Sequence, residues 1–395
     1  MATGRADKLL RRPEEPPATF LELFFDLAFV VAFIQISQGL VHDLSWRGFF
    51  DTLVLLLAMW WVWFITTSLT DRYDPQRPEI QMLVVATLVG SLVLAAALPE
   101  AFAERGLIFA GVYVAIQFGR GLFLVLAVRN PQLRRRPARA LFWFGVSAVP
   151  WIAGAMVHGP ARAALWALAV AVDYVGGTIG WPAPGLGRAP RWEWLVAAEH
   201  LAERYRQFFI IALGELILVS TLTLSHSGFA ASRTAAFLVS IAATVLLWRI
   251  YSHRAGEVLA TALRASSGPL RLAFWAKYTH MVMVAGIIVT AVGCELVIAH
   301  PLGHTRPSWV AVILGGPALF IAGRALFEYA VFSRVSPDRL IGLLVLAVAA
   351  PVTLLVPPLL VTLAATVVLT GIAINDTVRA RRRPAEPPSP AGGTA

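Results

Sequence analysis

Long apolar blocks separated by short polar segments dominate the chain, and each block is long enough to cross a lipid bilayer. A helix rises 1.5 Å per residue, so about 20 apolar residues span a hydrocarbon core roughly 30 Å thick. The blocks lack the strict alternation of a barrel strand, which favours helices. We predict twelve spanning helices, at residues 20–41, 48–70, 80–98, 106–128, 140–157, 163–181, 203–223, 234–251, 273–299, 308–332, 339–356 and 358–375.

The composition changes this picture little but excludes several classes of protein. Of 395 residues, 58% are hydrophobic and 14% are charged, and the mean hydropathy is +0.70. Soluble domains carry about 25% charged residues, so this chain lacks the polar surface of a soluble enzyme. A single cysteine, Cys294, excludes disulfides within one chain. The chain is predicted to be an all-α polytopic membrane protein.

The basic residues form short clusters between the apolar blocks, which indicates membrane topology rather than nucleic-acid binding despite a net charge of +10. With a cytoplasmic N-terminus, 25 basic residues fall in inner segments and five in outer loops. This partition predicts a multi-pass protein of the bacterial inner (plasma) membrane with both termini in the cytoplasm. The expected partner is the lipid bilayer, with anionic lipids at the basic tail Arg379–Arg383. The oligomeric state stays open.

Two short stretches of sequence recur at a nearly constant offset, which indicates an internal duplication. LVGSLVL at 88–94 resembles AVGCELV at 291–297, and GRGLF at 119–123 matches GRALF at 323–327. Six helices in each half would give two parallel repeats of the same orientation, as in one class of secondary transporters. The predicted organisation is an N-terminal tail at 1–17, a first repeat at 18–181, a linker at 182–199, a second repeat at 200–375 and a basic, Pro-rich tail at 376–395.

Ionisable residues inside the spans are the first candidates for function, because each costs about 2.5–3.5 kcal/mol at the centre of the membrane. Arg324 and Glu328 are spaced i,i+4, so one interpretation is a pair that neutralises itself on one helix. The candidates for a solute or ion path are Glu22, Asp26, Arg120, Asp173, Glu215, Glu295, Arg324 and Glu328.

Arg120 and the first helix pose a problem of charge balance. Position 124 is Leu, so Arg120 has no carboxylate one turn further along its own helix. We expect a partner from another helix, with Asp26 and Glu22 as first candidates. These two acids share a face by their i,i+4 spacing, and like charges there require a cation, an arginine or a proton.

Three acids, Asp173, Glu215 and Glu295, have no charged residue three or four positions away in the sequence. An apolar setting favours the neutral form of such an acid. One interpretation is a protonated acid that is hydrogen-bonded to a backbone carbonyl. The other is a carboxylate that binds a proton or a cation during function, and Glu215 is the strongest candidate for it.

A second group of polar residues is predicted at the cytoplasmic face. The segment from Asp71 to Asp74 has the DxxD spacing that can hold a divalent cation, although a solvated loop is the simpler interpretation. The dipole of the seventh helix explains an acid such as Glu203 in its first turn. The cytoplasmic-face candidates are Asp71, Arg72, Asp74, His200, Glu203 and Arg204.

Several stretches resemble the bacterial low-temperature-requirement A family of membrane proteins. They are LELFFDLAFV at 21–30, WWVWF…DRYD at 60–74, AEHLAERYRQFFIIALGE at 198–215 and AGIIVTAVGCE at 285–295. The family name implies a role in growth at low temperature and supplies no reaction or substrate. Carried over position by position, the resemblance highlights Glu22, Asp26, Arg72, His200, Glu203, Arg204, Glu215 and Glu295.

Three functions remain open at this stage. The leading hypothesis is a transporter-like protein with a polar path for a small solute or a coupling ion, without a cofactor. The second is a membrane-embedded enzyme acting on a lipid or isoprenoid, in which cytoplasmic-face carboxylates and His200 hold a divalent cation or act as acid and base. The third is a stress-related membrane protein whose charges only lock its helices together. No catalytic residue and no resident metal are assigned.

Overall fold

The computed structural model describes residues 9–11, 18–189, 197–253, 255–266 and 268–382. Within these residues the protein is all-α, with thirteen α-helices and one 3₁₀ turn, η1 (Leu98–Glu100). Ten of the described helices are long and apolar enough to cross a membrane. The polytopic helical architecture is therefore confirmed. Parts of both predicted tails and residues 190–196 of the predicted linker lie outside the described residues.

Two compact units make up the chain, and each is described by itself. The first unit is Met1–Gly39 with Trp46–His200, and the second is Leu40–Ser45 with Leu201–Ala395. The helices of the first unit are α1 (Phe20–His42), α2 (Trp46–Arg72), α3 (Pro78–Ala97), α4 (Gly106–Ala127), α5 (Pro131–Ala155) and α6 (Pro160–Thr178). The following helices are α7 (Ala198–Ser227), α8 (Ala231–Ser252), α9 (Ala255–Ala265), α10 (Pro269–Ala299), α11 (Pro307–Phe332), α12 (Pro337–Thr353) and α13 (Pro358–Arg382).

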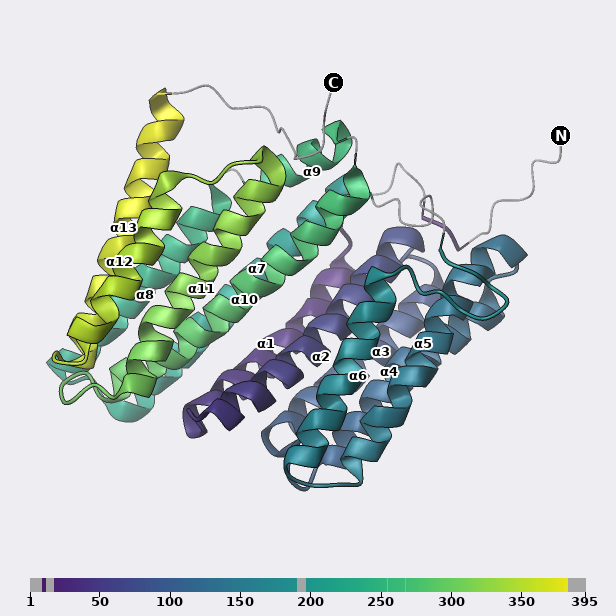
Figure 1. Ribbon diagram of the computed structural model, residues 1–395, viewed down its shortest axis with the longest axis horizontal. Helices are drawn as coiled ribbons and strands as arrows, with labels where there is room; N and C mark the ends of the chain where they lie inside the picture. The colour runs from purple at the N-terminus through teal and green to yellow at the C-terminus, as the bar shows by residue number, and fades with distance from the viewer. Residues whose placement is uncertain (1–8, 12–17, 190–196, 254, 267, 383–395) are drawn as a thin grey trace. The chain divides into compact units, whose positions relative to one another are not determined.

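Aromatic side chains fill the interior of the first unit. Helix α4 packs between α3 and α5, and α6 packs on both α5 and α2 (Figure 1). The Trp151 ring lies 4.5 Å from that of Tyr113 and 5.3 Å from that of Trp166, with all three side chains buried. Such tilted ring pairs add about 0.5–1.5 kcal/mol beyond their buried area. They hold α4, α5 and α6 together.

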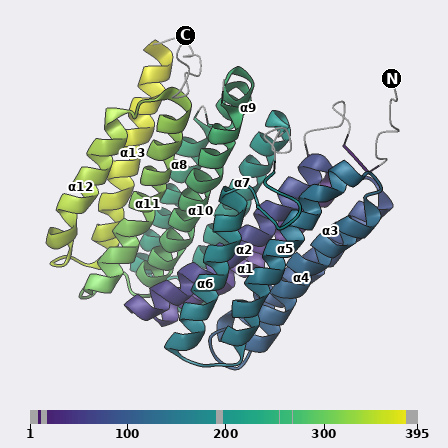
Figure 2. The ribbon, with the colours of Figure 1, turned by 45° about the vertical axis from the view of Figure 1, so that its right-hand side comes forward.

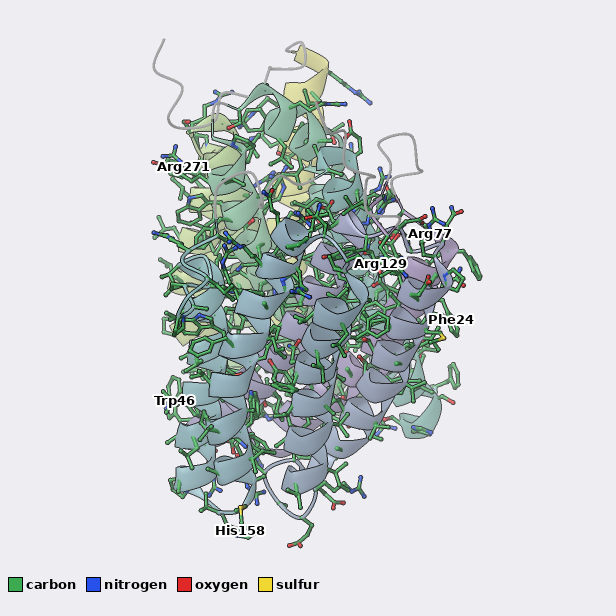
Figure 3. The ribbon with its side chains drawn as sticks, turned by 90° about the vertical axis from the view of Figure 1, so that its right-hand side faces the viewer. Phe24, Trp46, Arg77, Arg129, His158 and Arg271 are labelled. Atoms are coloured by element: carbon green, nitrogen blue, oxygen red, sulfur yellow. The ribbon has the colours of Figure 1, made fainter. Side chains whose placement is uncertain are left out.

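The loops of the first unit alternate between its two ends. Figure 3 shows Arg77, before α3, and Arg129, after α4, toward one end, and His158, between α5 and α6, at the other. Arg162 is one of the five basic residues counted in the outer loops, but it lies buried in the first turn of α6. Its guanidinium donates to the backbone carbonyls of Ala101, Ala103, Gly154, Ala155 and Val157. Arg162 therefore satisfies carbonyls that the end of α5 and the η1–α4 loop leave exposed.

Glycines set the close packing of α10 against α11 in the second unit, where the two helices lie side by side (Figure 2). Gly286 and Gly293 of α10, and Gly316 and Gly323 of α11, are each seven residues apart. A Cβ at Gly316 would lie 2.5 Å from the backbone nitrogen of Thr290. Small residues at such positions let two membrane helices approach with their backbones almost in contact.

All twelve predicted blocks coincide with helices, although two of these helices are not among the ten candidate spans. They are α6, with 19 residues, and α12, with 17. Pro357 and Pro358 divide α12 from α13 as predicted. The sequence analysis missed α9, which has only 11 residues. Its buried Leu259, Ala262 and Leu263 follow amphipathic helical spacing rather than forming a long apolar block.

Candidate functional site

The start of α1 positions the first acid of the site through a capping box. Thr19 precedes the helix, and its backbone N–H donates to Glu22 Oε2 at 2.8 Å, while the Glu22 backbone N–H lies 3.4 Å from Thr19 Oγ1. This reciprocal pair satisfies two backbone donors that the helix itself leaves unpaired. It also fixes the side chain of Glu22 so that its second oxygen, Oε1, faces another element.

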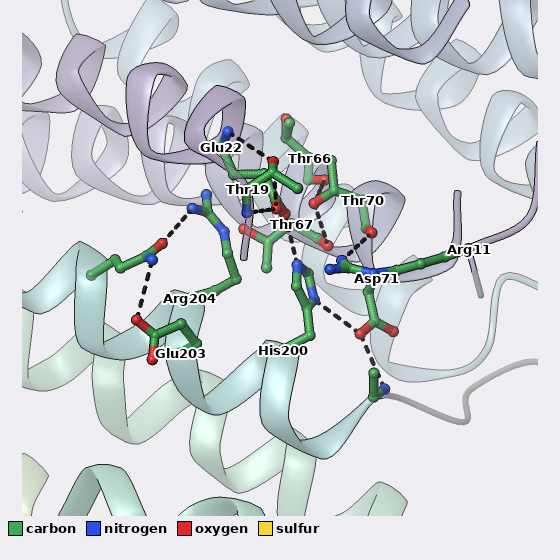
Figure 4. Close-up of polar contacts among 12 residues, drawn as sticks. Arg11, Thr19, Glu22, Thr66, Thr67, Thr70, Asp71, His200, Glu203 and Arg204 are labelled. Atoms are coloured by element: carbon green, nitrogen blue, oxygen red, sulfur yellow. Dashed lines mark hydrogen bonds and ion pairs between the residues drawn. The ribbon is translucent and has the colours of Figure 1, made fainter. Parts of the chain in front are cut away.

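That second oxygen meets His200, in the first turn of α7. His200 Nε2 lies 2.7 Å from Glu22 Oε1, and His200 Nδ1 lies 3.0 Å from Asp71 Oδ1 at the C-terminal end of α2 (Figure 4). The side chains of Glu22 and His200 are each 1% exposed. Asp71 Oδ1 also accepts a hydrogen bond at 3.1 Å from the backbone of Ala197. Asp71 is therefore not the solvated loop residue of the simpler interpretation but an anchor for the start of α7.

The proton count of this cluster determines what it can do. An imidazole that donates from both ring nitrogens is an imidazolium, and it then balances one of the two carboxylates. Alternatively, a neutral His200 donates to one carboxylate and accepts from the other in its protonated form. The two states differ only in where one proton lies. The Glu22–His200–Asp71 cluster can therefore move a proton between its two carboxylates without a change in total charge.

A short N-terminal segment, residues 9–11, packs against the same end of α2. The Arg11 backbone N–H donates to Arg72 O at 3.0 Å, and the Asp74 N–H donates to Leu9 O at 2.8 Å. The Arg11 side chain donates to Thr70 O at 2.8 Å. These bonds satisfy carbonyls at the C-terminal end of the helix. Arg11, one of the 25 basic residues counted in the inner segments, thus has a defined place at this end of α2.

Further inside the first unit, Arg120 has partners other than the predicted acids. Its guanidinium donates to Thr66 Oγ1 at 2.9 Å and to Gln117 Oε1. The carboxylate whose charge acts on it is Asp173, not Glu22 or Asp26. The expectation of a first-helix partner was wrong because the helix face that carries Arg120 is turned toward α2 and α6.

Two further acids of the first unit are held by aromatic donors. Trp63 Nε1 donates to Asp26 Oδ1 at 2.9 Å, and the Tyr113 hydroxyl donates to Asp173 Oδ2 at 2.8 Å. Asp26 and Asp173 are 0% and 2% exposed, respectively. Both acids therefore lie inside the helix bundle of the first unit, and their place on a polar path stays a prediction.

The contacts seen for three of the remaining cytoplasmic-face candidates, Asp74, Glu203 and Arg204, include bonds to residues close to them in the sequence. Asp74 accepts the Gln76 N–H at 2.7 Å and pairs with Arg77 at 3.3 Å, so its carboxylate closes a local turn. In the second unit, Glu203 and Arg204 both bond to Gln207 on their own helix, at 3.2 Å and 3.0 Å.

Arg324 and Glu328 act on each other electrostatically, as their spacing predicted, but among the described residues they do not come within ion-pair distance. Arg324 instead donates to the carbonyls of Ile250 and His253 at the end of α8, the second at 2.9 Å. Glu328 accepts from the backbone and hydroxyl of Ser336. The helix spacing allowed the pair, but the C-terminal carbonyls of α8 compete for the guanidinium.

Other charged groups at this end of the second unit pair across helices. Arg339 of α12 binds Asp376 of α13 at 2.6 Å. Arg379 binds Ser336 and Asp338, and its contact with anionic lipids stays a prediction.

The two acids of the second unit, Glu215 and Glu295, keep their predicted candidacy. Glu215 is fully buried in α7, and its charge acts on Cys294 of α10. Glu295 is half-buried on α10. A role for either residue in proton or cation binding stays a prediction.

Among the described residues, no group of three or more His, Cys, Asp or Glu side chains has the geometry to hold a metal ion. Within the cluster, each ring nitrogen of His200 already faces a carboxylate oxygen. The divalent cation of the enzyme hypothesis stays a prediction, and the described residues offer no group of ligands for it.

Sequence reasoning missed the neutral partners of the charged groups. Thr19 was identifiable from the T-x-x-E pattern that it forms with Glu22. Thr66, Gln117 and Tyr113 gave no such signal, because a polar residue in an apolar helix does not reveal which neighbouring helix it faces.

Comparisons with known proteins agree with the resemblance seen in the motifs. The model of a family described as bacterial low temperature requirement A protein matches residues 17–374. A relative, the uncharacterized protein RA0937 of Rhizobium meliloti (strain 1021), is 37% identical over 331 residues, which cover 82% of this chain and 80% of the relative. No solved structure matches the chain. The residues of the Glu22–His200–Asp71 cluster all lie within the family match.

Proposed function

The chain belongs to the bacterial low temperature requirement A family, and for this member we propose a transporter-like function in which the first unit carries a coupling proton along a buried polar path. The path begins at the Glu22–His200–Asp71 cluster. The single observation that supports it most is the run of buried polar side chains that leads from this cluster into the interior of the helix bundle.

The first half of the path lies on one face of α2. Trp63, Thr66, Thr67, Thr70 and Asp71 follow the spacing i, i+3, i+4, i+7 and i+8, which places them on one side of a helix. All but Asp71 are at most 2% exposed. From Asp71 to Thr66 the stripe extends about 8 Å along the helix axis. Polar groups therefore continue from the cluster into the membrane.

The second half of the path passes to α4 and α6. Thr66 receives the hydrogen bond of Arg120, Arg120 also binds Gln117, and Tyr113 lies one turn further along the same face of α4. Tyr113 then donates to Asp173. From Arg120 to Tyr113 this segment extends about a further 10 Å along the axis of α4. The two segments together cover more than half of a hydrocarbon core roughly 30 Å thick.

The incomplete hydrogen bonding of the buried polar groups along this path favours transport over a purely structural role. Gln117 Nε2 and Asp173 Oδ1 are buried without a close hydrogen bond among the described residues, although Tyr113 lies beside Gln117, and Ser147 and Trp151 lie beside Asp173. Helices that are locked together by polar groups gain most when every buried polar atom is paired. Unpaired donors and acceptors beside a charged pair are instead suited to a water molecule or a proton in transit.

We also propose that the two units derive from one duplicated six-helix repeat. Arg120 of α4 and Asp173 of α6 act on each other electrostatically, as do Arg324 of α11 and Asp376 of α13. The offsets between these residues are 204 and 203 positions, which agree with the offset of the sequence repeat. The packing of α3 on α4, α4 on α5 and α5 on α6 is repeated by α10 on α11, α11 on α12 and α12 on α13.

Proton flux into sealed vesicles tests the proposed function. Purified protein is reconstituted into liposomes loaded with a pH-sensitive dye, and a potassium gradient with valinomycin supplies an inside-negative potential. We expect His200→Gln and Asp173→Asn to reduce the initial rate of acidification at least tenfold, because neither replacement can take up and release a proton. Glu79→Gln is the matched control, since Glu79 is an exposed acid in the first turn of α3.

Two outcomes would contradict the proposal. One is wild-type proton flux no greater than that of empty liposomes. The other is equal flux in wild type and in a His200→Gln protein that elutes as a single folded species. The inner-membrane location and the cytoplasmic position of both termini belong to the same proposal, because they define the side from which the proton enters.

A further inference from the structure

An apolar groove runs along the outer surface of the first unit, between α4, α5 and α6. Its volume is about 800 Å³, and residues that line it include Phe118, Val125, Leu141, Gly145, Val149 and Leu168. All of its lining residues are apolar, and the buried polar path faces the opposite, inner side of α4. The volume lies within the range of roughly 300–1,000 Å³ that is typical of small-molecule sites.

The length of the groove matches one leaflet of a bilayer. On α5 its lining extends from Ala138 to Pro150, which is about 18 Å along the helix axis. Half of a hydrocarbon core roughly 30 Å thick is about 15 Å. The absence of a side chain at Gly145 keeps the middle of the groove open, because a Cβ there would already touch the Phe118 ring at 3.8 Å.

Two exposed arginines continue the same face of α5 beyond the groove. Arg134 lies four residues before Ala138 and seven before Leu141, and Arg135 lies seven before Phe142. These intervals correspond to whole turns of a helix, so both side chains lie above the mouth of the groove. A slot of leaflet length that ends at a pair of positive charges complements a lipid with an anionic head.

We propose that this groove binds one anionic glycerophospholipid, with an acyl chain along Gly145 and Val149 and the phosphate of the head group at Arg134 and Arg135. The lipid belongs to the leaflet next to the α4–α5 loop, which the charge partition predicts to be cytoplasmic. This site is separate from the proposed proton path, so either can fail without the other.

Native mass spectrometry of protein released from mixed phosphatidylglycerol and phosphatidylcholine membranes tests the lipid site. Wild type is expected to retain one phosphatidylglycerol in preference to phosphatidylcholine. Replacement of both arginines, Arg134→Gln with Arg135→Gln, should weaken this retention about 30-fold, because each arginine near an anionic head contributes about 1 kcal/mol. The matched control is Arg264→Gln with Arg271→Gln, two exposed arginines of the second unit.

The tail end of the site is tested by filling the groove. Gly145→Leu should abolish retention, whereas Gly371→Leu, at an exposed helical glycine with open space around it, should not. If Gly145→Leu fails to fold, Val149→Trp serves instead, because Val149 is 69% exposed at the groove surface.

Three results would overturn the proposal. One is equal retention of phosphatidylglycerol by the arginine variant and its control. Another is undiminished retention in a folded groove-filled variant. The third is a wild-type dimer that dissociates when the groove is filled, which would assign the groove to a second copy of the chain.

Discussion

The contact between α10 and α11 makes a sharp prediction about Gly316→Ala. A Cβ at this position would lie 2.5 Å from both the backbone nitrogen and the Oγ1 of Thr290, whereas ordinary contact begins at 3.4 Å. The two helices must therefore separate locally by about 0.9 Å, which forfeits a quarter to a half of the dispersion energy of the contacts affected. Overpacking of this kind costs about 1–3 kcal/mol, and van der Waals packing is a main force between membrane helices.

The neighbouring glycine provides a matched control on the same helix. Gly315 has no atom within 4 Å of the position of an added Cβ. Gly315→Ala should therefore leave the α10–α11 contact intact and favour the helix by up to about 1 kcal/mol through the higher helix propensity of Ala. The two substitutions add the same methyl group to adjacent positions, so the opposite signs of their effects isolate the contact itself.

The single cysteine provides the assay. Cys294 is buried on α10, next to Gly293, whose own Cβ would lie 3.0 Å from Ile313 of α11. Its side chain lies beside Ser240 of α8, so its reaction with a thiol-reactive dye in detergent reports local opening of the packing around α10, which loosening of the α10–α11 contact promotes. A cost of about 1–3 kcal/mol should accelerate labelling of Gly316→Ala about 5- to 150-fold relative to wild type. Labelling of Gly316→Ala within twofold of wild type would refute the argument from backbone contact.

Two further predictions concern arginines, one buried at a helix start and one in the linker between α6 and α7. In chemical denaturation, Arg162→Gln should lower the free energy of unfolding by more than about 2 kcal/mol, because buried carbonyls lose charged donors. The control Arg105→Gln should lower it by less than about 1 kcal/mol, since the Arg105–Glu100 pair is exposed. Equal losses of stability in the two variants would contradict the role assigned to Arg162. Arg188→Cys in a Cys294→Ser background should resist an impermeant thiol reagent added to intact cells, whereas labelling from outside would reverse the predicted topology.

Most residues of the candidate site could be predicted individually, but which of them contact one another could not. Glu22, Asp71 and His200 were all candidates, yet His200 is separated by 178 residues from Glu22 and by 129 from Asp71. An acid at a helix start and another at a helix end give no sign in the sequence that one imidazole lies between them. The capping box of Glu22 is local, and for that reason the T-x-x-E pattern alone was enough to indicate it.

Two predicted charge pairs are not direct contacts, for a common physical reason. The i,i+4 spacing of Arg324 and Glu328 permits an ion pair on one helix, but the carbonyls at the end of α8 offer the guanidinium better-placed acceptors. Arg120 was assigned acids of the first helix because they carry charge, whereas it binds the neutral Thr66 and Gln117. In each case the rotation of a helix about its own axis, which depends on its neighbours, determined the partner.

The sequence by itself determined the membrane class of the protein and the positions of its long apolar helices, although not of the short α9. The thickness of the hydrocarbon core dictates the length of an apolar block, and this constraint acts on each segment independently of the others. Only the tertiary structure decided which faces meet, because the pairing of Glu22 and Asp71 with His200 and the contact of Gly316 with Thr290 require segments distant in sequence. Within apolar helices, a few small or polar side chains set these contacts, and their partners lie on other helices.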